Sequence, residues 1–350
     1  MSIPLVTVFI PVYNGEKYIR ESLESILYQT YQNLEILIVD DGSTDNTVKI
    51  VKSFHDSRIR LLINEENKGI PYTRNRGLAE ANGKYLAIMD ADDISYPHRI
   101  QKQVEFMEKN PEIDVAASYY KMIGGKLNKT FKPKFIKKNE LKIDLLFANS
   151  VGNPTSMIRM ETIKKHNLRY NENYFVSQDY GMWTEISKIG NLVIMPDVLL
   201  KYRFGHENIS KKSEETKWKK RKIIIDSIHK NLLDYYGFNL NDKELETYNN
   251  FFSERPEITV NKNVLNNLPN VIKKLINHNR KNSIFDSKLF IEIMYFRIIN
   301  NLSGANIPLS EKFKLYKLLN KCRDDGGKVE EKLFIVLKHF YKKSKNRENI

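Results

Sequence analysis

Acidic residues form three short clusters, and each cluster lies at the end of an apolar segment or at the start of a helical one. Asp40-Asp41-Gly42-Ser43 and Asp90-Ala91-Asp92-Asp93 follow apolar segments, and Gln178-Asp179 opens a helical stretch. Carboxylates gathered at one edge of a sheet repel each other unless a positive group lies among them. Their oxygen atoms suit a hard divalent cation, which can neutralise a departing diphosphate. The clusters predict metal-assisted chemistry with Mn²⁺ or Mg²⁺.

Each cluster by itself is also compatible with ordinary turn chemistry. An Asp-x-Asp turn after a strand, such as Asp90-Ala91-Asp92, is more often a helix cap or an Asx-turn than a metal site. The same holds for Asp40-Asp41-Gly42-Ser43. Only the combination of clusters in this order, each after the appropriate strand, favours the catalytic interpretation.

The elements that would position these clusters alternate between two hydrophobic periods. Short apolar runs rich in β-branched residues predict buried strands, and amphipathic stretches between them predict helices. This alternation indicates a mainly parallel sheet covered on both faces, with ligands bound outside the carboxyl ends of its strands. The predicted strands are 5–11, 35–40, 59–63, 84–90 and 113–118, and the predicted helices are 16–31, 44–54, 71–82 and 97–109.

The later part of the chain has a different character. Residues 121–150 are rich in Lys and Asn and predict a connection or a loop over the site, whereas 191–195 and 199–204 predict short strands. After about residue 210 glycine becomes rare, and long Lys-, Asn- and Leu-rich segments predict helices. Two of them, 287–302 and 329–341, have apolar residues at helical spacing.

Composition limits the classes of protein that this chain can belong to. Hydrophobic residues make up 41% of the 350 residues, enough for a buried core. The single cysteine, Cys322, excludes a disulfide within the chain and a cysteine-based metal site. No segment approaches the ~20 apolar residues that span a bilayer, and no signal peptide is evident. We therefore expect a cytoplasmic protein, either free or peripheral on the inner face of the cell membrane.

Positive charge is concentrated in the C-terminal part. The chain carries a net charge of +14, and residues 211–350 hold 29 of its 57 basic residues but only 17 of its 43 acidic ones. Such an excess indicates either an acidic partner or a solvated helical surface. Both interpretations remain open at this point.

Four motifs taken together closely resemble glycosyltransferase family 2. They are Pro11-Val12-Tyr13-Asn14, Val39-Asp40-Asp41-Gly42-Ser43-Thr44-Asp45, Asn67-Lys68-Gly69 with Arg74-Asn75, and Asp90-Ala91-Asp92-Asp93. The resemblance covers roughly residues 3–210 and implies the GT-A fold, an α/β fold with a Rossmann-like sheet. It implies a catalytic domain over 1–210, with a nucleotide-binding half (1–110) and an acceptor half (111–210). A basic, mostly helical accessory domain would then occupy 211–350.

The resemblance also implies roles for individual residues. Asp92 and His206 would hold the metal ion. Asp40 would be structural. The alternative to a phosphate contact for Arg74 is a helix-surface ion pair with Glu80 or another acid. The residues implied to bind the nucleotide-sugar are Pro11, Tyr13, Asp41, Asn67, Arg74, Asp90, Asp93 and Arg203.

Asp179 matches the position of the family's catalytic base. The family usually has an acidic pair there, Glu-Asp, whereas this chain has Gln178-Asp179, so only Asp179 can accept a proton. Attack by the deprotonated acceptor hydroxyl from the face opposite the diphosphate would invert the anomeric centre. The alternative for Asp179 is a helix N-cap. For Trp183 we prefer core packing to stacking on an acceptor sugar.

The resulting hypothesis is an inverting glycosyltransferase that moves a sugar from a nucleotide-diphosphate donor, expected to be a UDP-sugar, to a glycan or lipid-linked glycan. A nucleotidyltransferase is an alternative, but its glycine-rich phosphate loop is missing from the first turn. A nucleic-acid-binding protein is the other alternative, through the basic C-terminal region, although we expect no nucleic acid. That region could instead pack on the catalytic domain, form a homodimer, or contact a membrane surface through its basic helices.

Overall fold

The computed structural model describes residues 3–124, 128–204, 215–308 and 310–312 of the chain. The chain forms two compact units, Met1–Tyr235 and Tyr236–Ile350. Within the described residues no helix is long and apolar enough to cross a membrane.

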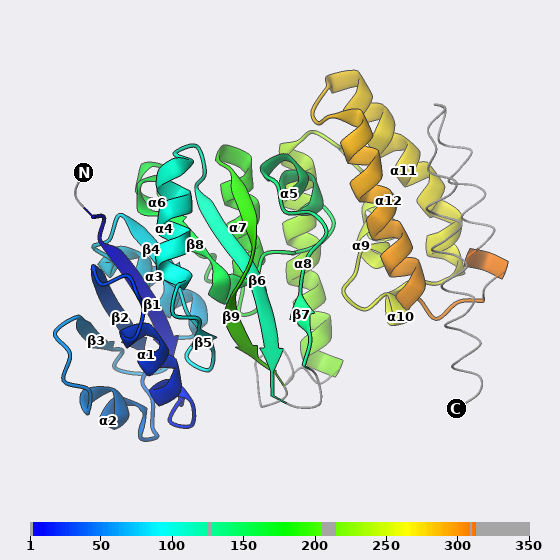
Figure 1. The fold of residues 1–350 in the computed structure, drawn as a ribbon. Helices are drawn as coiled ribbons and strands as arrows, with labels where there is room; N and C mark the ends of the chain where they lie inside the picture. Colours follow the sequence, from blue (N-terminus) through cyan, green and yellow to red (C-terminus); the bar gives the residue numbers. More distant parts are fainter. Residues whose placement is uncertain (1–2, 125–127, 205–214, 309, 313–350) are drawn as a thin grey trace. The chain divides into compact units, whose positions relative to one another are not determined.

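The first unit contains one mixed sheet of nine strands with helices packed around it (Figure 1). The first half alternates between strand and helix, as the sequence predicts, except that the two-residue strand β5 follows β4 directly. Its elements are β1 (Val6–Val12), α1 (Ile19–Leu27), β2 (Leu34–Asp40), α2 (Thr47–Lys52), β3 (Ile59–Ile63), α3 (Ile70–Glu80), β4 (Tyr85–Ile88), β5 (Ile94–Ser95) and α4 (Arg99–Lys109). Strands β3, β2, β1 and β4 are adjacent and parallel, so their carboxyl ends meet at one edge.

Both faces of the parallel part are covered by helices. Alternate β1 residues such as Val8 and Ile10 belong to one core cluster with Leu23 of α1 and Val104 of α4. On the opposite face Phe9 lies so close to Gly77 of α3 that a Cβ atom there would stand 2.4 Å from the ring. Because successive side chains of a strand point to opposite faces, the continuous apolar run of β1 is explained by burial on both sides.

The remaining strands of the first unit run in both directions, so this part of the sheet is mixed. Strand β4 pairs antiparallel with β8, β8 pairs antiparallel with β6, and β6 pairs parallel with β9. The elements are β6 (Val115–Ile123), β7 (Thr130–Phe131), α5 (Lys138–Asp144), the 3₁₀ turn η1 (Asn153–Thr155), β8 (Met157–Arg159), α6 (Met160–Lys165), α7 (Gln178–Ile189), β9 (Leu192–Arg203) and α8 (Glu215–Tyr235).

Two sequence predictions in this part differ from the structure. The two short strands predicted at 191–195 and 199–204 form the single strand β9, whose register against β6 shifts near Tyr119. The stretch 121–150, expected to be a connection, contains the end of β6, all of β7 and helix α5. The irregular register interrupts the alternation of side chains between the two faces of the sheet. For this reason the hydrophobic pattern of one long strand predicts two short ones.

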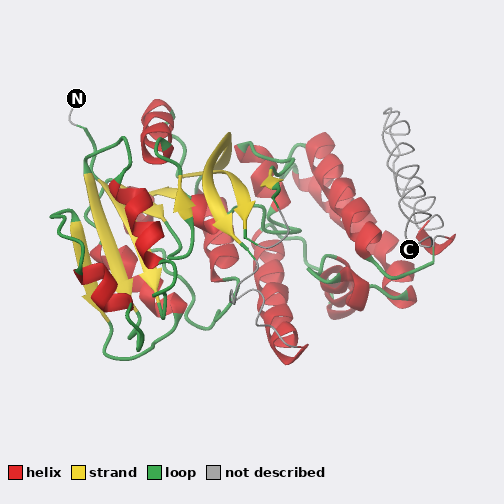
Figure 2. Cartoon of the chain, turned by 60° about the horizontal axis from the view of Figure 1, so that its bottom comes forward, coloured by secondary structure: helices red, strands yellow, loops and turns green. Residues whose placement is uncertain are grey.

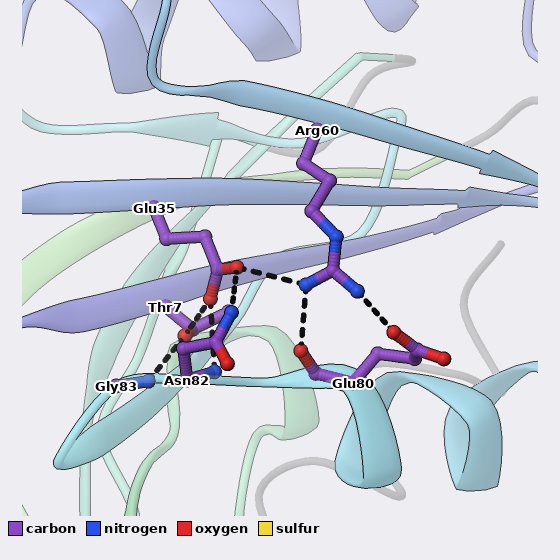
Figure 3. A network of polar contacts seen from close by, with 6 residues as sticks. All are labelled: Thr7, Glu35, Arg60, Glu80, Asn82 and Gly83. Carbon is purple, nitrogen blue, oxygen red and sulfur yellow. Dashed lines mark hydrogen bonds and ion pairs between the residues drawn. The ribbon is translucent and has the colours of Figure 1, made fainter.

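A polar network ties together the amino edge of the sheet, opposite the end where the acidic clusters lie (Figure 3). The Glu35 carboxylate at the start of β2 accepts hydrogen bonds from the Thr7 hydroxyl (2.5 Å), from the Asn82 backbone (3.0 Å) and from Arg60 (3.0 Å). Arg60 also pairs with Glu80 at the end of α3. Burial raises the pKa of Glu35, but these hydrogen bonds outweigh it and lower the pKa below its ordinary value.

The described part of the second unit is helical (Figure 2). Its helices are α9 (Asp242–Phe251), α10 (Pro256–Thr259), α11 (Lys262–Asn282) and α12 (Ser287–Gly304). Phe290, Ile293, Met294 and Ile298 of α12 are buried, which confirms the helix predicted over 287–302. The helix predicted over 329–341 lies outside the described residues.

The division between the units falls later in the chain than the sequence prediction places it. Helix α8 was expected in the accessory domain after residue 210, but it packs on α7 and belongs to the first compact unit, which extends to Tyr235. Tyr174 in the loop before α7 shares a hydrogen bond with Ser227 of α8 (3.1 Å). Apolar residues of α8, including Ile228 and Leu232, are also buried.

The amino-edge network yields a prediction about stability. Glu35→Gln removes the charge that Thr7, Asn82 and Arg60 stabilise, and we expect the free energy of unfolding to fall by about 2 kcal/mol at pH 7. Because the folded-state pKa of Glu35 is lowered, this stabilisation is present above its ordinary value of 4.5 and disappears as the pH falls below it. Urea unfolding of both proteins between pH 3.5 and 7 measures the difference.

The control for this prediction is Glu24→Gln, which affects an exposed ion pair with Arg20 at 4.0 Å. It should change the free energy of unfolding by less than about 0.5 kcal/mol. A loss in Glu35→Gln that stayed constant down to pH 3.5 would contradict the assigned role of the carboxylate charge.

Candidate active site

The carboxyl edge of the sheet begins with Asp41, directly after β2. Its side chain is 4% exposed, and one carboxylate oxygen accepts hydrogen bonds from the Asn64 side chain (2.6 Å) and from the Lys68 backbone (3.0 Å). The other oxygen accepts from the Gly69 backbone (2.9 Å). Asp41 thereby fixes the turn between β3 and α3 to the end of β2.

The neighbouring turns are held by similar short-range bonds. Asp40 accepts a hydrogen bond from the Ser43 backbone (2.8 Å), which supports the structural role considered for it. Gly42 has a φ of +73°, and a Cβ atom there would stand 2.7 Å from the backbone carbon of Glu66. Only glycine satisfies both constraints without strain, which explains the Asp-Asp-Gly-Ser sequence at this position.

The acidic loop after β4 is held in place by Arg203 at the end of β9. The Arg203 backbone donates to the Asp93 carboxylate (2.8 Å), and its Nε donates to the Asp92 carbonyl oxygen (2.8 Å). Its outer guanidinium nitrogen pairs with Glu21 of α1 (2.5 Å). The guanidinium also lies over the Tyr18 ring. Arg203, predicted to contact the nucleotide-sugar, therefore contacts the acidic loop itself.

Carboxylates in this loop raise each other's pKa. Burial raises the pKa of Asp90 to about 6, and the negative charges of Asp92 and Asp179 contribute while Arg74 opposes them. The pKa of Asp93 lies well above its ordinary value because of burial and the charges of Asp90 and Asp92. One Asp93 oxygen is buried without a hydrogen-bond partner. The loop is thus an electrostatically unfavourable cluster that a cation would relieve.

A buried arginine lies beneath the loop. Arg99 at the start of α4 is fully buried and donates to the carbonyl oxygen of Ile88 (2.8 Å) and to the Gln103 side chain (3.0 Å). Burial lowers its pKa to about 10, while Asp93 and Asp90 raise it. Arg99 therefore supplies positive charge from inside the fold.

Arg74 approaches the acidic loop from α3. It is 6% exposed, and its guanidinium lies 3.7 Å from a carboxylate oxygen of Asp90 and over the ring of Tyr170. Its Nε and Nη1 atoms are buried without a hydrogen-bond partner. The alternative of an ion pair on the helix surface is wrong, because Arg74 is buried and Glu80 pairs with Arg60. The acid that Arg74 does meet is Asp90.

Asp179 lies in the first turn of α7, close enough to Asp90 to raise its pKa. One of its carboxylate oxygens accepts a hydrogen bond from the Asn149 side chain (3.2 Å). The N-cap residue of α7 is Ser177, which has a left-handed φ of 54°, so the N-cap alternative for Asp179 is wrong. Trp183, one turn further, is fully buried, as core packing predicts.

The structure brings most, but not all, of the predicted site residues to this edge. Pro11 is the β1 partner of Val39, and the Asp41 backbone donates to the carbonyl oxygen of Val12 (2.8 Å), so the ends of β1 and β2 are adjacent. Tyr13 and Asn67 are exposed on the flanking loops. His206 lies outside the described residues.

Two residues of the site were missed by the sequence analysis. Arg99 falls on the buried stripe of α4 with Ile100 and Val104, and a charged residue in such a stripe is a signal that could have been used. Asn149 gave no such signal, because it lies between elements in a stretch without periodicity and meets Asp179 only in the fold.

The contacts of Arg203 with the acidic loop lead to a prediction about stability. Arg203→Ala keeps the backbone hydrogen bond to Asp93 but removes the side-chain hydrogen bond to the Asp92 carbonyl oxygen, the ion pair with Glu21 and the contact with the Tyr18 ring. We expect it to lower the free energy of unfolding by about 2 kcal/mol. Urea unfolding measures this loss. In Glu21→Gln, which removes only the exposed outer partner, the change should stay below about 0.5 kcal/mol. Equal losses in the two variants would show that the loop contacts contribute nothing.

Comparisons with known proteins identify the family of this chain. The family model described as "Glycosyl transferase family 2" matches residues 7–172. A protein of Haemophilus influenzae described as an "uncharacterized glycosyltransferase" is 38% identical over 237 residues, which is 64% of this chain and 73% of that protein. The Escherichia coli UDP-Glc:alpha-D-GlcNAc-diphosphoundecaprenol beta-1,3-glucosyltransferase WfgD is 33% identical over 209 residues, which is 59% of this chain and 79% of WfgD.

Solved structures show the same fold. The crystal structure of S. aureus TarS 1–349 in complex with UDP-GlcNAc aligns with a TM-score of 0.57 at 20% identity, and the alignment covers 85% of this chain and 88% of that one. Neither the nucleotidyltransferase nor the nucleic-acid-binding alternative finds support in these comparisons. The matched relatives and the acidic edge of the sheet together show that this chain is a glycosyltransferase of family 2 with the GT-A fold.

Proposed function

We propose that this enzyme transfers a sugar from a UDP-sugar to a hydroxyl of a lipid-linked glycan, with inversion at the anomeric carbon. The observation that carries the proposal is the proximity of Asp179 to the acidic loop. Asp179 is near enough to Asp90 for its charge to raise the pKa of that carboxyl group. A proton acceptor and a diphosphate-binding loop can then act on opposite sides of one sugar ring.

Arg74 is the residue proposed to contact the diphosphate. It is nearly buried, and two of its guanidinium nitrogens have no hydrogen-bond partner. Arginine offers donors in a planar arrangement that matches phosphate oxygens. Its ion pair with Asp90 is long, at 3.7 Å, so the guanidinium can also serve a second anionic group.

Mn²⁺ or Mg²⁺ would be held by Asp92 together with Asp90 or Asp93. The donor set fits such an ion, since it consists of hard carboxylate oxygens, one of them a buried Asp93 oxygen without a partner. Among the described residues no three His, Cys, Asp or Glu side chains are arranged to hold an ion by themselves. Diphosphate oxygens are therefore proposed as the remaining ligands. When bound, the ion would neutralise charge on the leaving diphosphate.

Asp179 is proposed as the general base. The acceptor hydroxyl gives its proton to the Asp179 carboxylate while its oxygen forms a bond to the anomeric carbon. The bond between that carbon and the diphosphate oxygen breaks, and the electron pair leaves with the diphosphate. Because the attacking and leaving oxygens lie on opposite faces of the sugar, the configuration inverts without a covalent enzyme intermediate.

The donor and acceptor classes rest on the relatives. The E. coli enzyme that this chain resembles is named for a UDP-sugar donor and for an acceptor linked to diphosphoundecaprenol. Asp41 and the turn that it fixes lie at the end of β2, beside Pro11 and Tyr13, where the uracil base is proposed to bind. Contact of the C-terminal basic region with anionic lipid would bring the enzyme to such an acceptor.

The proposed metal site predicts a defect in donor binding. A UDP-sugar at about 100-fold over its dissociation constant should stabilise the protein by ~2.7 kcal/mol in the presence of Mn²⁺. Asp92→Asn should lose most of this Mn²⁺-dependent stabilisation, because the neutral amide lacks the negative charge with which a carboxylate holds a divalent cation. Thermal unfolding with a panel of nucleotide-sugars measures the effect and identifies the donor.

Asp197→Asn is the control, because Asp197 forms a surface ion pair with Lys102. It should respond to donor and metal as the unchanged protein does. A full Mn²⁺ response in Asp92→Asn would remove Asp92 from the metal site.

The proposed base predicts a defect in transfer alone. Asp179→Asn should keep donor binding within about twofold but lose at least ~100-fold in kcat, which is in the usual range for a general base. UDP release with the intact enzyme and a lipid-linked acceptor measures kcat. Glu185→Gln on the exposed face of the same helix, where Glu185 pairs with Lys188, should leave kcat unchanged. Full activity of Asp179→Asn would mean that another residue is the base.

A further inference from the structure

The segment between α5 and η1 is fastened to the first turn of α7 at two places. The Tyr180 hydroxyl donates a hydrogen bond to the carbonyl oxygen of Leu145 (2.6 Å). One residue earlier on the helix, Asp179 accepts a hydrogen bond from Asn149 (3.2 Å). The two bonds join the same two parts of the chain, but only the second reaches the carboxylate.

The orientation of the Asn149 amide is fixed by a second contact. Its side-chain oxygen accepts a hydrogen bond from the Val151 backbone (3.0 Å). Because the backbone N–H can only donate, the amide oxygen must face Val151 and the NH₂ group must face Asp179. Asn149 is therefore a donor to the carboxylate.

We propose that Asn149 is a positioning residue that holds one oxygen of Asp179, so that the other oxygen receives the proton of the acceptor hydroxyl. The proposal rests on the proposed function, in which Asp179 is the general base. The hydrogen bond from Asn149 orients the Asp179 carboxylate. A carboxylate that turns freely presents the correct lone pair to the acceptor hydroxyl only part of the time.

Charged and aromatic groups from several elements surround Asp179 and its neighbour Tyr180. Asp90 after β4 is the acidic group that interacts with Asp179, and Arg74 on α3 pairs with that same Asp90. Tyr170, in the loop before α7, also interacts with Asp179. From α8, His229 packs edge-on against the Tyr180 ring. Among these groups Asn149 is the neutral side chain that donates a hydrogen bond to the Asp179 carboxylate.

Asp179 has no acidic neighbour at the start of α7, because the residue before it is Gln178. Gln178 offers no negative charge and no proton acceptor of comparable strength. A single carboxylate must therefore be correctly oriented by other means. Helix α7 fixes its backbone through Ser177, whose left-handed φ of 54° sets the start of the helix, and Asn149 fixes its side chain.

The test compares Asn149→Ala with Tyr180→Phe in the full-length enzyme. Asn149→Ala should lower kcat by roughly tenfold, the scale of one hydrogen bond to a charged group, with the KM for the UDP-sugar unchanged. The loss should appear in kcat alone, because Asn149→Ala leaves the proposed donor-binding residues in place. Tyr180→Phe removes the neighbouring bond, which does not reach the carboxylate, and should leave kcat close to that of the unchanged enzyme.

Asn149→Asp is a second, nearly isosteric variant that keeps an acceptor for Val151 and guards against misfolding of the alanine variant. An ionised carboxylate offers no donor to Asp179, so the kcat of this variant should fall at least as far as that of Asn149→Ala. A normal kcat in both Asn149 variants would overturn the proposal, as would an equal loss of kcat in Tyr180→Phe.

Asp179→Asn separates this proposal from the one on which it rests. If that variant is inactive while the Asn149 variants behave normally, Asp179 remains the base and Asn149 is not its positioning residue. If Asp179→Asn is active, the assigned base is wrong and the role of Asn149 fails with it.

Discussion

The repulsion among carboxylates at one edge of the sheet is the interaction on which the rest of the site depends. Asp90, Asp92 and Asp93 follow β4 within a single loop, and Asp179 acts on the same loop from α7. Such a cluster would be unfavourable in isolation. The fold supports it with three arginines that approach from different elements: Arg99 beneath the loop, Arg74 from α3 and Arg203 from β9. The loop can remain acidic because this positive charge is built around it.

The two edges of the sheet divide stability and function between them. At the amino edge, Glu35 accepts hydrogen bonds from Thr7, Asn82 and Arg60, and its charge is stabilised. At the carboxyl edge, the pKa of Asp90 is raised and one Asp93 oxygen is buried without a partner. Burial acts on both edges, so the difference lies in the donors that each carboxylate receives and in the negative charges that lie beside Asp90 and Asp93. The satisfied edge holds the strands together, and the unsatisfied edge retains capacity for a ligand.

The sequence predicted the parts of this structure that depend on local chemistry. The alternation of strand-like and helix-like hydrophobic patterns predicted the parallel half of the sheet. The order of the motifs predicted the family. It did not predict that 191–204 forms one strand, because an irregular register hides the alternation, or that α8 belongs to the first unit, because charged residues at its start resemble a linker. The contact between Asn149 and Asp179 joins positions 30 residues apart and has no local signature. Such contacts depend on the path of a loop past the end of a helix. Hydrophobic periodicity does not predict that path.

Several polar atoms near the acidic loop are buried without hydrogen-bond partners, which lowers stability and leaves them able to bind a ligand. They include Nε and Nη1 of Arg74, one carboxylate oxygen of Asp93 and both polar side-chain atoms of Asn153. Each such group costs about 1–3 kcal/mol of stability when it stays unpaired. Arg74 and Asp93 flank Asp90 from α3 and from its own loop, and the 3₁₀ turn with Asn153 packs against β4, from which that loop emerges. In the proposed function, the phosphate oxygens of the donor are the partners of the Arg74 nitrogens, so part of the binding free energy would come from groups that the fold itself leaves unsatisfied.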